Sequence, residues 1–200
     1  MPEKGSNFER DMCKGMSLWI SHGTRVDVFM RNRVRVTEAT PNRERQLSDL
    51  TSNVIEGIYY TSLFVTECKT GYSKTRKGKR TKNIPWDLLD LIDSPKRDSN
   101  KVLLNFWDQV YTDAQLCGKY PLLLFKRDFH VECACVDVRS RNLIYDYCGS
   151  DKHIPHLCYS DLEMLDKWQT KHLYIYRLED FLNWFNPDII ETMHKERMKK

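Results

Sequence analysis

The residues with the clearest chemical potential stand at positions 66–69, Thr-Glu-Cys-Lys, where a strand-like run ends. Side chains two apart on a strand point to the same face, about 7 Å apart along the chain. Glu67 and Lys69 are therefore expected to lie side by side. A lone Glu-x-Lys is a common pattern and is most often a surface ion pair. Its other interpretation is half of a site in which a carboxylate holds a metal ion and an amine acts on a water bound to that ion.

Three more groups of oxygen ligands favour the metal interpretation. Asp49 is expected on the preceding extended segment, and two carboxylates on adjacent strands can hold one hard cation. The backbone carbonyl of Cys68 would be a further ligand, and Glu9 on the first helix would supply a third carboxylate. Lys69 would then orient the attacking water or stabilise the developing charge.

Periodicity predicts which elements position these groups. Apolar residues recur at helical spacing in some segments and alternate in others. The expected helices are 6–21, 84–92, 100–116, a short one opened by the capping pattern 160–163, 179–185 and 187–198. The expected strands are 28–36, an extended stretch at 49–55, 58–70 after a hairpin turn at Glu56-Gly57, 120–125, the pair 129–138 and 142–148, and 173–178. This order predicts an α/β fold with a mixed sheet flanked by helices.

Length and composition exclude several classes of protein. The chain has 200 residues, 40% of them hydrophobic, which fits one globular domain, 1–200, with a core over about 6–140 and an extension over about 141–200. No apolar run reaches the ~20 residues of a membrane span, and the first ten residues lack the apolar stretch of a signal peptide. Seven irregularly spaced cysteines make a poor disulfide framework. We therefore expect a protein of the cytosol of its cell or host.

The front of the chain is basic. Residues 1–82 hold 16 Lys and Arg against 9 Asp and Glu, whereas residues 83–200 hold 16 against 19. Arg31, Arg33 and Arg35 alternate on an expected strand. Six of the nine residues at 74–82 are basic and none is apolar: Lys74, Arg76, Lys77, Lys79, Arg80 and Lys82. Such surfaces bind nucleic-acid backbones through their phosphates, although a run of charges can also be only a solvated loop.

One weaker feature completes the candidate sites. Zinc-type side chains gather at Cys133, Cys135, Cys148, His153, His156 and Cys158. They lack a C-x-x-C pair, and Cys133 and Cys135 are expected to point into the core from one strand face.

The chain resembles the PD-(D/E)xK nuclease superfamily, in particular Holliday-junction-resolvase-like proteins of archaea and phages. The resemblance covers most of the chain through short motifs in order. They are Gly-Ser-Asn-Phe-Glu-Arg at 5–10, Ser-Leu-Trp at 17–19, Asp-Val-Phe at 27–29, Ser-Asp-Leu at 48–50, Phe-Val-Thr-Glu-Cys-Lys at 64–69, the strand with basic end at 118–127, and Leu-Glu-Asp-Phe-Leu at 178–182. The chain departs from the family in having Ser-Asp where Pro-Asp is usual, so Asp27 is a rival for the role of Asp49.

The resemblance implies a restriction-endonuclease-like core and a Mg2+-dependent deoxyribonuclease, with Mn2+ as a substitute. Glu9, Asp49 and Glu67 would bind the metal, and Lys69 would position the water. Gln109, on the helix expected at 100–116, would be a weaker candidate for positioning Lys69 or a phosphate, but an exposed polar helix residue is the favoured interpretation. The implied substrate is DNA, branched if the protein is a resolvase, the implied assembly is a homodimer, and the implied location is the cytoplasm of a bacterial cell or a phage-infected host. Two alternatives stay open: a catalytically inactive or packaging-associated DNA-binding protein on the same fold, and a restriction- or repair-type nuclease with sequence preference.

Overall fold

The computed structural model describes residues 3–32, 47–70, 75–76, 79–80, 102–127, 130–160 and 169–199. Within them, helices and strands alternate along the chain. The helical elements are α1 (Glu3–Ile20), α2 (Ile55–Leu63), α4 (Val102–Leu116), α5 (Val138–Cys148), α7 (Leu178–Trp184), η3 (Pro187–Ile189) and α8 (Ile190–Arg197). The strands are β1 (Met30–Arg31), β2 (Leu50–Thr51), β3 (Phe64–Thr70), β4 (Thr75–Arg76), β5 (Lys79–Arg80), β6 (Tyr120–Lys126), β7 (Glu132–Asp137), β8 (His156–Tyr159) and β9 (Leu173–Arg177).

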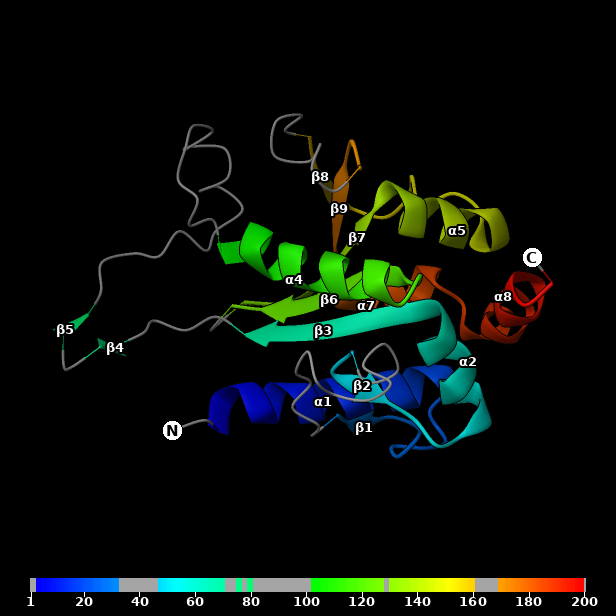
Figure 1. Ribbon diagram of the computed structural model, residues 1–200, viewed down its shortest axis with the longest axis horizontal. Coiled ribbons are helices and arrows are strands. Elements are labelled where there is room, and N and C mark those ends of the chain that lie inside the picture. The colour runs from blue at the N-terminus through cyan, green and yellow to red at the C-terminus, as the bar shows by residue number, and fades with distance from the viewer. Residues whose placement is uncertain are drawn as a thin grey trace.

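A five-stranded mixed sheet forms the centre, in the order β3-β6-β7-β9-β8. β3 and β6 run parallel and are connected through α4, as parallel neighbours need a crossover. The other pairs are antiparallel, and β8 and β9 bring the C-terminal part of the chain into this same sheet. Figure 1 shows α4 above β3 and β6, with α1 on the opposite side of the sheet.

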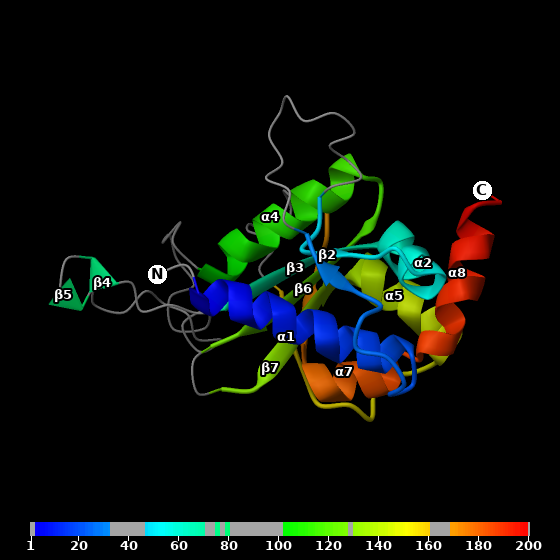
Figure 2. The same cartoon turned by 90° about the horizontal axis from the view of Figure 1, so that it is seen from below.

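Two hydrophobic clusters hold the sheet between its helices, because successive strand residues point to opposite faces. On β3, Val65 packs with Trp107 of α4 in one cluster. Phe64 and Cys68 pack with Met16 of α1 in the other. Figure 2, seen from below, shows α1 and α7 side by side in front of the sheet, and both belong to this second cluster. β3 therefore presents one row of side chains to α4 and the other to α1.

The prediction of a hairpin at Glu56-Gly57 is wrong. Residues 55–63 form α2, which runs directly into β3. Tyr60 and Leu63 are buried at helical spacing, so packing overrides the strand preference of this Tyr- and Thr-rich stretch. A Cβ at Gly57 would lie 2.2 Å from Ser52 Oγ, so only glycine permits this approach of helix and loop. Asp49 and Glu67 come together in space, but not through a hairpin.

The expected strand at 142–148 is also wrong, because these residues belong to α5. Asp137, the last residue of β7, accepts a 2.7 Å hydrogen bond from the Ser140 amide and so caps the helix. Ile144 then packs into the core. Residues 139–141, which were expected to form a polar turn between two strands, instead form part of the first turn of α5.

Most other expected elements are confirmed. The helices expected at 6–21, 100–116 and 179–185 are α1, α4 and α7, and the strands expected at 120–125 and 173–178 are β6 and β9. The strand expected at 28–36 is described only as β1, and the helices expected at 84–92 and 160–163 fall outside the described residues, except for Ser160 itself. None of the helices in the described ranges has the length and hydrophobicity for crossing a membrane.

Candidate active site

Glu67 and Lys69 lie together at the end of β3 on the face that α4 covers. The Lys69 ammonium donates a hydrogen bond to Glu67 Oε1. Glu67 is only 5% exposed. From α4, Gln109 Nε2 donates a second bond of 2.7 Å to the same oxygen. Gln109 is exposed as expected, yet its amide contacts the candidate catalytic carboxylate.

Asp49 lies at the outer edge of β3, opposite the edge that pairs with β6. Its amide donates to the Thr66 carbonyl at 2.8 Å, and its Oδ2 accepts from the Cys68 amide at 2.7 Å. The amide and carbonyl of one strand residue point to the same edge, so strand geometry directs the Cys68 carbonyl toward Asp49. Two of the expected oxygen ligands, the Asp49 carboxylate and the Cys68 carbonyl, are therefore brought to the outer edge of the strand that also carries Glu67.

Ser48 sets the position of Asp49. Its Oγ accepts from the Thr66 amide at 3.1 Å and donates to the Thr66 carbonyl at 3.1 Å, taking the place of a backbone partner for β3. Ser48 has a φ of 150°, which L-residues rarely adopt. Strained backbone of this kind persists where the surroundings fix it, and it is enriched at functional sites.

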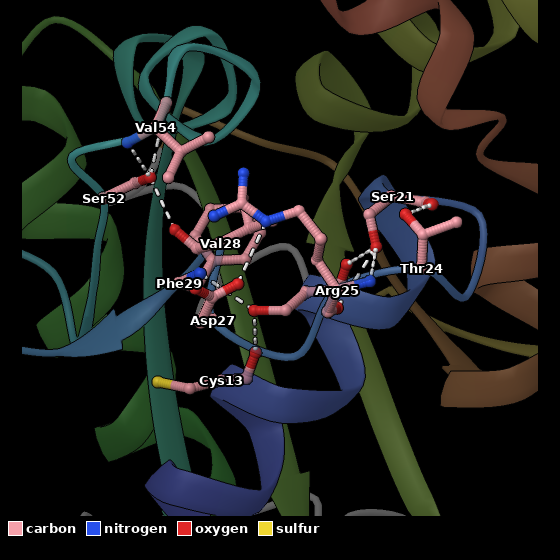
Figure 3. A network of polar contacts seen from close by, with 10 residues as sticks. Cys13, Ser21, Thr24, Arg25, Asp27, Val28, Phe29, Ser52 and Val54 are labelled. Carbon is pink, nitrogen blue, oxygen red and sulfur yellow. Dashed lines mark hydrogen bonds and ion pairs between the residues drawn. The ribbon is translucent and has the colours of Figure 1, made fainter.

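Asp27 lies on the loop after α1, away from this edge. Figure 3 shows its carboxylate joined to Arg25, at 3.0 Å, within a network that also ties Ser52 to the Val28 carbonyl. The Asp27 side chain is 69% exposed. Of the two rival aspartates, the structure brings Asp49 to β3.

Glu9 lies on α1 and approaches the same edge of the sheet from the other face. Its carboxylate forms an ion pair with Arg31 of β1, and the two side chains are 19% and 28% exposed. The Asn32 amide donates to the Asp49 carbonyl at 2.9 Å, so β1 is fastened directly to the segment that carries Asp49. The contact between Arg31 and Glu9 has no signal in the sequence.

Burial dominates the electrostatics of the site. It raises the pKa of Asp49 to about 6, against the lowering effect of the Cys68 amide. Burial, followed by the nearby charge of Asp49, raises the pKa of Glu67 to about 7. Burial lowers the pKa of Lys69, but the charge and hydrogen bond of Glu67 and the charge of Asp49 act the other way. The net pKa is raised, so the ammonium stays charged at neutral pH.

The oxygen ligands suit a hard divalent cation in their chemistry, but they do not form a complete three-ligand site among the described residues. Within the described part of the chain, no three His, Cys, Asp or Glu side chains form a group that could hold a metal ion. Mg2+ is commonly bound by one or two carboxylates and keeps several waters. Asp49, Glu67 and the Cys68 carbonyl match that pattern. A cation there would offset the cost of burying two ionised carboxylates.

The expected phosphate-binding residues are described only in part. Arg31 is bound to Glu9. Thr75–Arg76 and Lys79–Arg80 pair as the antiparallel strands β4 and β5. The other expected positions lie outside the described residues: Arg33, Arg35, Lys74, Lys77 and Lys82.

The cysteine and histidine cluster at 133–158 forms no metal-ligand group among the described residues. Cys135 is fully buried and Cys133 packs against the same hydrophobic cluster, which confirms that both point into the core from one strand face. All seven cysteines of the chain are described, and all are free thiols.

We expect Mg2+ to stabilise the protein more at about pH 8 than at about pH 5.5. The folded-state pKa values of Asp49 and Glu67 lie above their ordinary values. Their contribution to stability is therefore fully present below about pH 4 and is lost as the pH rises through 6 to 7. A cation binds the ionised carboxylates and displaces their protons. Thermal unfolding with and without Mg2+ measures the shift; a shift that shrinks with rising pH would contradict this assignment.

For the DNA-cutting activity expected from the sequence, replacing Gln109 by alanine should lower turnover about tenfold and leave DNA affinity unchanged, because the Gln109 amide donates a hydrogen bond to the Glu67 carboxylate. Gln115→Ala, at an exposed position of the same helix, is the matched control. The measurement is single-turnover cutting at saturating DNA. Equal rates for both variants would mean that the Gln109 contact is incidental.

No protein-family model, curated protein or solved structure matches the chain.

Proposed function

We propose that this protein is a metal-dependent endonuclease that hydrolyses DNA phosphodiester bonds, with a preference for branched DNA. One observation carries the proposal: the Asp49 carboxylate is bound to the Cys68 amide of the strand that also carries Glu67 and Lys69. Two carboxylates, a strand carbonyl and a lysine at one sheet edge are suited to phosphodiester hydrolysis.

Each residue has a distinct part in this mechanism. Asp49, Glu67 and the Cys68 carbonyl would hold Mg2+, which supplies a polarised water and neutralises charge at the scissile phosphate. Lys69 stays protonated, so it donates hydrogen bonds rather than accepting a proton. It orients the attacking water and stabilises the charge that develops on the phosphate oxygens. Gln109 and Lys69 together fix the orientation of Glu67.

The test is cutting of four DNA forms by the purified protein. Labelled four-way junction, flap, duplex and single-stranded DNA are each incubated with Mg2+, with Mn2+ and with a chelator. We expect metal-dependent cutting, fastest on the four-way junction. A protein that binds these forms without cutting any would instead be a DNA-binding protein on the same fold. Equal cutting of all duplex forms, with a sequence preference, would indicate a restriction- or repair-type nuclease.

Oligomeric state separates the branched-DNA assignment from simple nicking. A resolvase cuts two symmetric strands and therefore needs two copies of the site. We expect a dimer by sedimentation and paired incisions on the junction. A monomer that makes single nicks would contradict the resolvase assignment while leaving the nuclease assignment intact.

Replacing Arg76, Lys77, Lys79 and Arg80 together by serine should weaken binding to every DNA form. The segment 74–82 has six basic residues and no carboxylate, so it suits phosphate binding that does not depend on base sequence. The log–log salt slope should flatten by about one unit for each phosphate that the variant no longer neutralises. Anisotropy over a salt series gives both quantities. Unchanged affinity and slope would show that the segment is only solvated.

A further inference from the structure

The ion pair between Glu9 and Arg31 differs from an ordinary surface pair. Its side chains are 19% and 28% exposed, whereas those of Asp27 and Arg25 on the neighbouring loop are 69% and 42% exposed. It also joins two separate elements, α1 and β1. A half-buried pair of this kind is screened less by solvent than an exposed one.

Arg31 is part of the acidic site through its position. In the ladder of β1 and β2 it lies opposite Leu50, the residue after Asp49. Both members of the pair act on Asp49: the Glu9 charge raises the pKa of the Asp49 carboxyl, and the Arg31 charge lowers it. The guanidinium therefore supplies positive charge beside the Asp49 and Glu9 carboxylates.

The carboxylates divide these partners between them. Glu67 binds Lys69 and Gln109, Asp49 binds the Cys68 amide, and Glu9 binds Arg31. Of the three expected metal ligands, Glu9 is the one whose carboxylate pairs with Arg31. Among the described residues, Glu9 does not join Asp49 and Glu67 in a three-ligand group.

The backbone allows Arg31 to change partners without moving β1. The adjoining Asn32 is fastened by its amide to the Asp49 carbonyl and by its Nδ2 to the Ser48 carbonyl at 3.1 Å. A long side chain on a fixed strand can swing between two acceptors. Arginine binds a phosphate as readily as a carboxylate, through two parallel N–H donors.

We propose that Arg31 is an internal counter-cation, which holds Glu9 away from the metal site in the metal-free protein and moves to a DNA phosphate when a divalent cation takes its place. This rests on the proposed nuclease function. Metal and DNA then favour each other's binding. A cation that binds Glu9 releases Arg31 to bind a phosphate, and a phosphate that binds Arg31 releases Glu9 to bind the cation. Such coupling is reciprocal between the two ligands.

The first experiment measures Mg2+ affinity without DNA by calorimetry. Arg31→Gln removes the competing cation and should tighten Mg2+ binding about fivefold or more. Arg31→Lys keeps the charge and should bind Mg2+ like the wild type. The matched control is Arg25→Gln, which removes the same charge from the exposed pair with Asp27 and should change nothing.

The second experiment measures the coupling on duplex DNA by anisotropy, with Ca2+ as an oxygen-preferring probe. Ca2+ should raise the DNA affinity of the wild type about fivefold more than that of Arg31→Gln. Glu9→Gln removes the carboxylate charge that pairs with Arg31, so it should raise DNA affinity in the absence of metal. This second variant tests the exchange even where Arg31→Gln does not fold.

The outcomes separate the two ideas. Wild-type protein that binds neither Mg2+ nor Ca2+ would contradict the proposed function. Wild-type protein that binds metal while Arg31→Gln binds it equally or more weakly would overturn the role of Arg31 and leave the nuclease assignment standing. Unchanged DNA affinity in Glu9→Gln would also overturn it.

Discussion

Replacing Lys69 by alanine is expected to lower the rate of DNA cutting by about 10²–10³-fold, while DNA affinity changes little. The ammonium is bound to Glu67 and stays charged. In the proposed mechanism it acts on the attacking water and on charge that exists only in the transition state. Loss of such an interaction appears in turnover rather than in binding. Single-turnover rates and anisotropy on the same DNA give the two quantities.

The control for Lys69→Ala is Lys195→Ala, which removes an exposed ammonium from α8, where it pairs with Glu191. That variant should cut like the wild type. Equal losses of binding and cutting in Lys69→Ala would make Lys69 a phosphate clamp rather than a catalytic residue.

Replacing Glu67 by glutamine is expected to abolish cutting and, at about pH 8, to stabilise the metal-free protein on the order of 1 kcal/mol. Burial opposes the ionised carboxylate, which raises the pKa of Glu67 to about 7, and a neutral amide of the same size removes that cost. Lys69 and Gln109 keep an oxygen acceptor in the variant. Thermal unfolding and cutting assays on one preparation give both effects.

Lower stability together with abolished cutting would indicate that Glu67 has a structural part in the fold. The variant should also lose the Mg2+-dependent rise in unfolding temperature, because it removes a proposed metal ligand. Gln115→Glu, on an exposed position of α4, tests whether an acidic change nearby affects the fold without touching the site.

The helices and strands with strong periodicity were predictable from sequence. The apolar spacing of Phe8, Met12 and Met16 marks α1, and all three side chains are buried. The continuous apolar run at 121–125 marks β6, which lies inside the sheet. In these segments local pattern and tertiary packing agree, so periodicity is sufficient.

The predictions were wrong for segments in which tertiary packing outweighs the local preference of the residues. Residues 55–63 are rich in residues that favour strands, but the close contact between Gly57 and Ser52 and the burial of Tyr60 hold them as a helix. At α5, the sequence Asp137-x-x-Ser140 carries a helix-capping signal. The strand that precedes it nevertheless led to the expectation of a second strand at 142–148. Periodicity alone does not distinguish these cases.

The candidate site was predictable as a set of residue types and not as a set of contacts. Glu67 and Lys69 share a strand face, which alternation alone predicts. The contacts of Gln109 with Glu67 and of Arg31 with Glu9 join residues 42 and 22 positions apart and depend on how α4 and β1 pack. The unusual backbone at Ser48 has no sequence signature, since glycine is the residue expected at such angles.

The most direct measurement compares wild-type protein and Glu67→Gln, purified in parallel, on a labelled four-way junction with and without Mg2+. Metal-dependent nuclease activity at this site predicts incision by the wild type with Mg2+ only, and none by Glu67→Gln under any condition, with both proteins folded and both binding the junction. Equal incision by the two proteins, or no incision of the junction or of any other DNA form by the wild type, would contradict it.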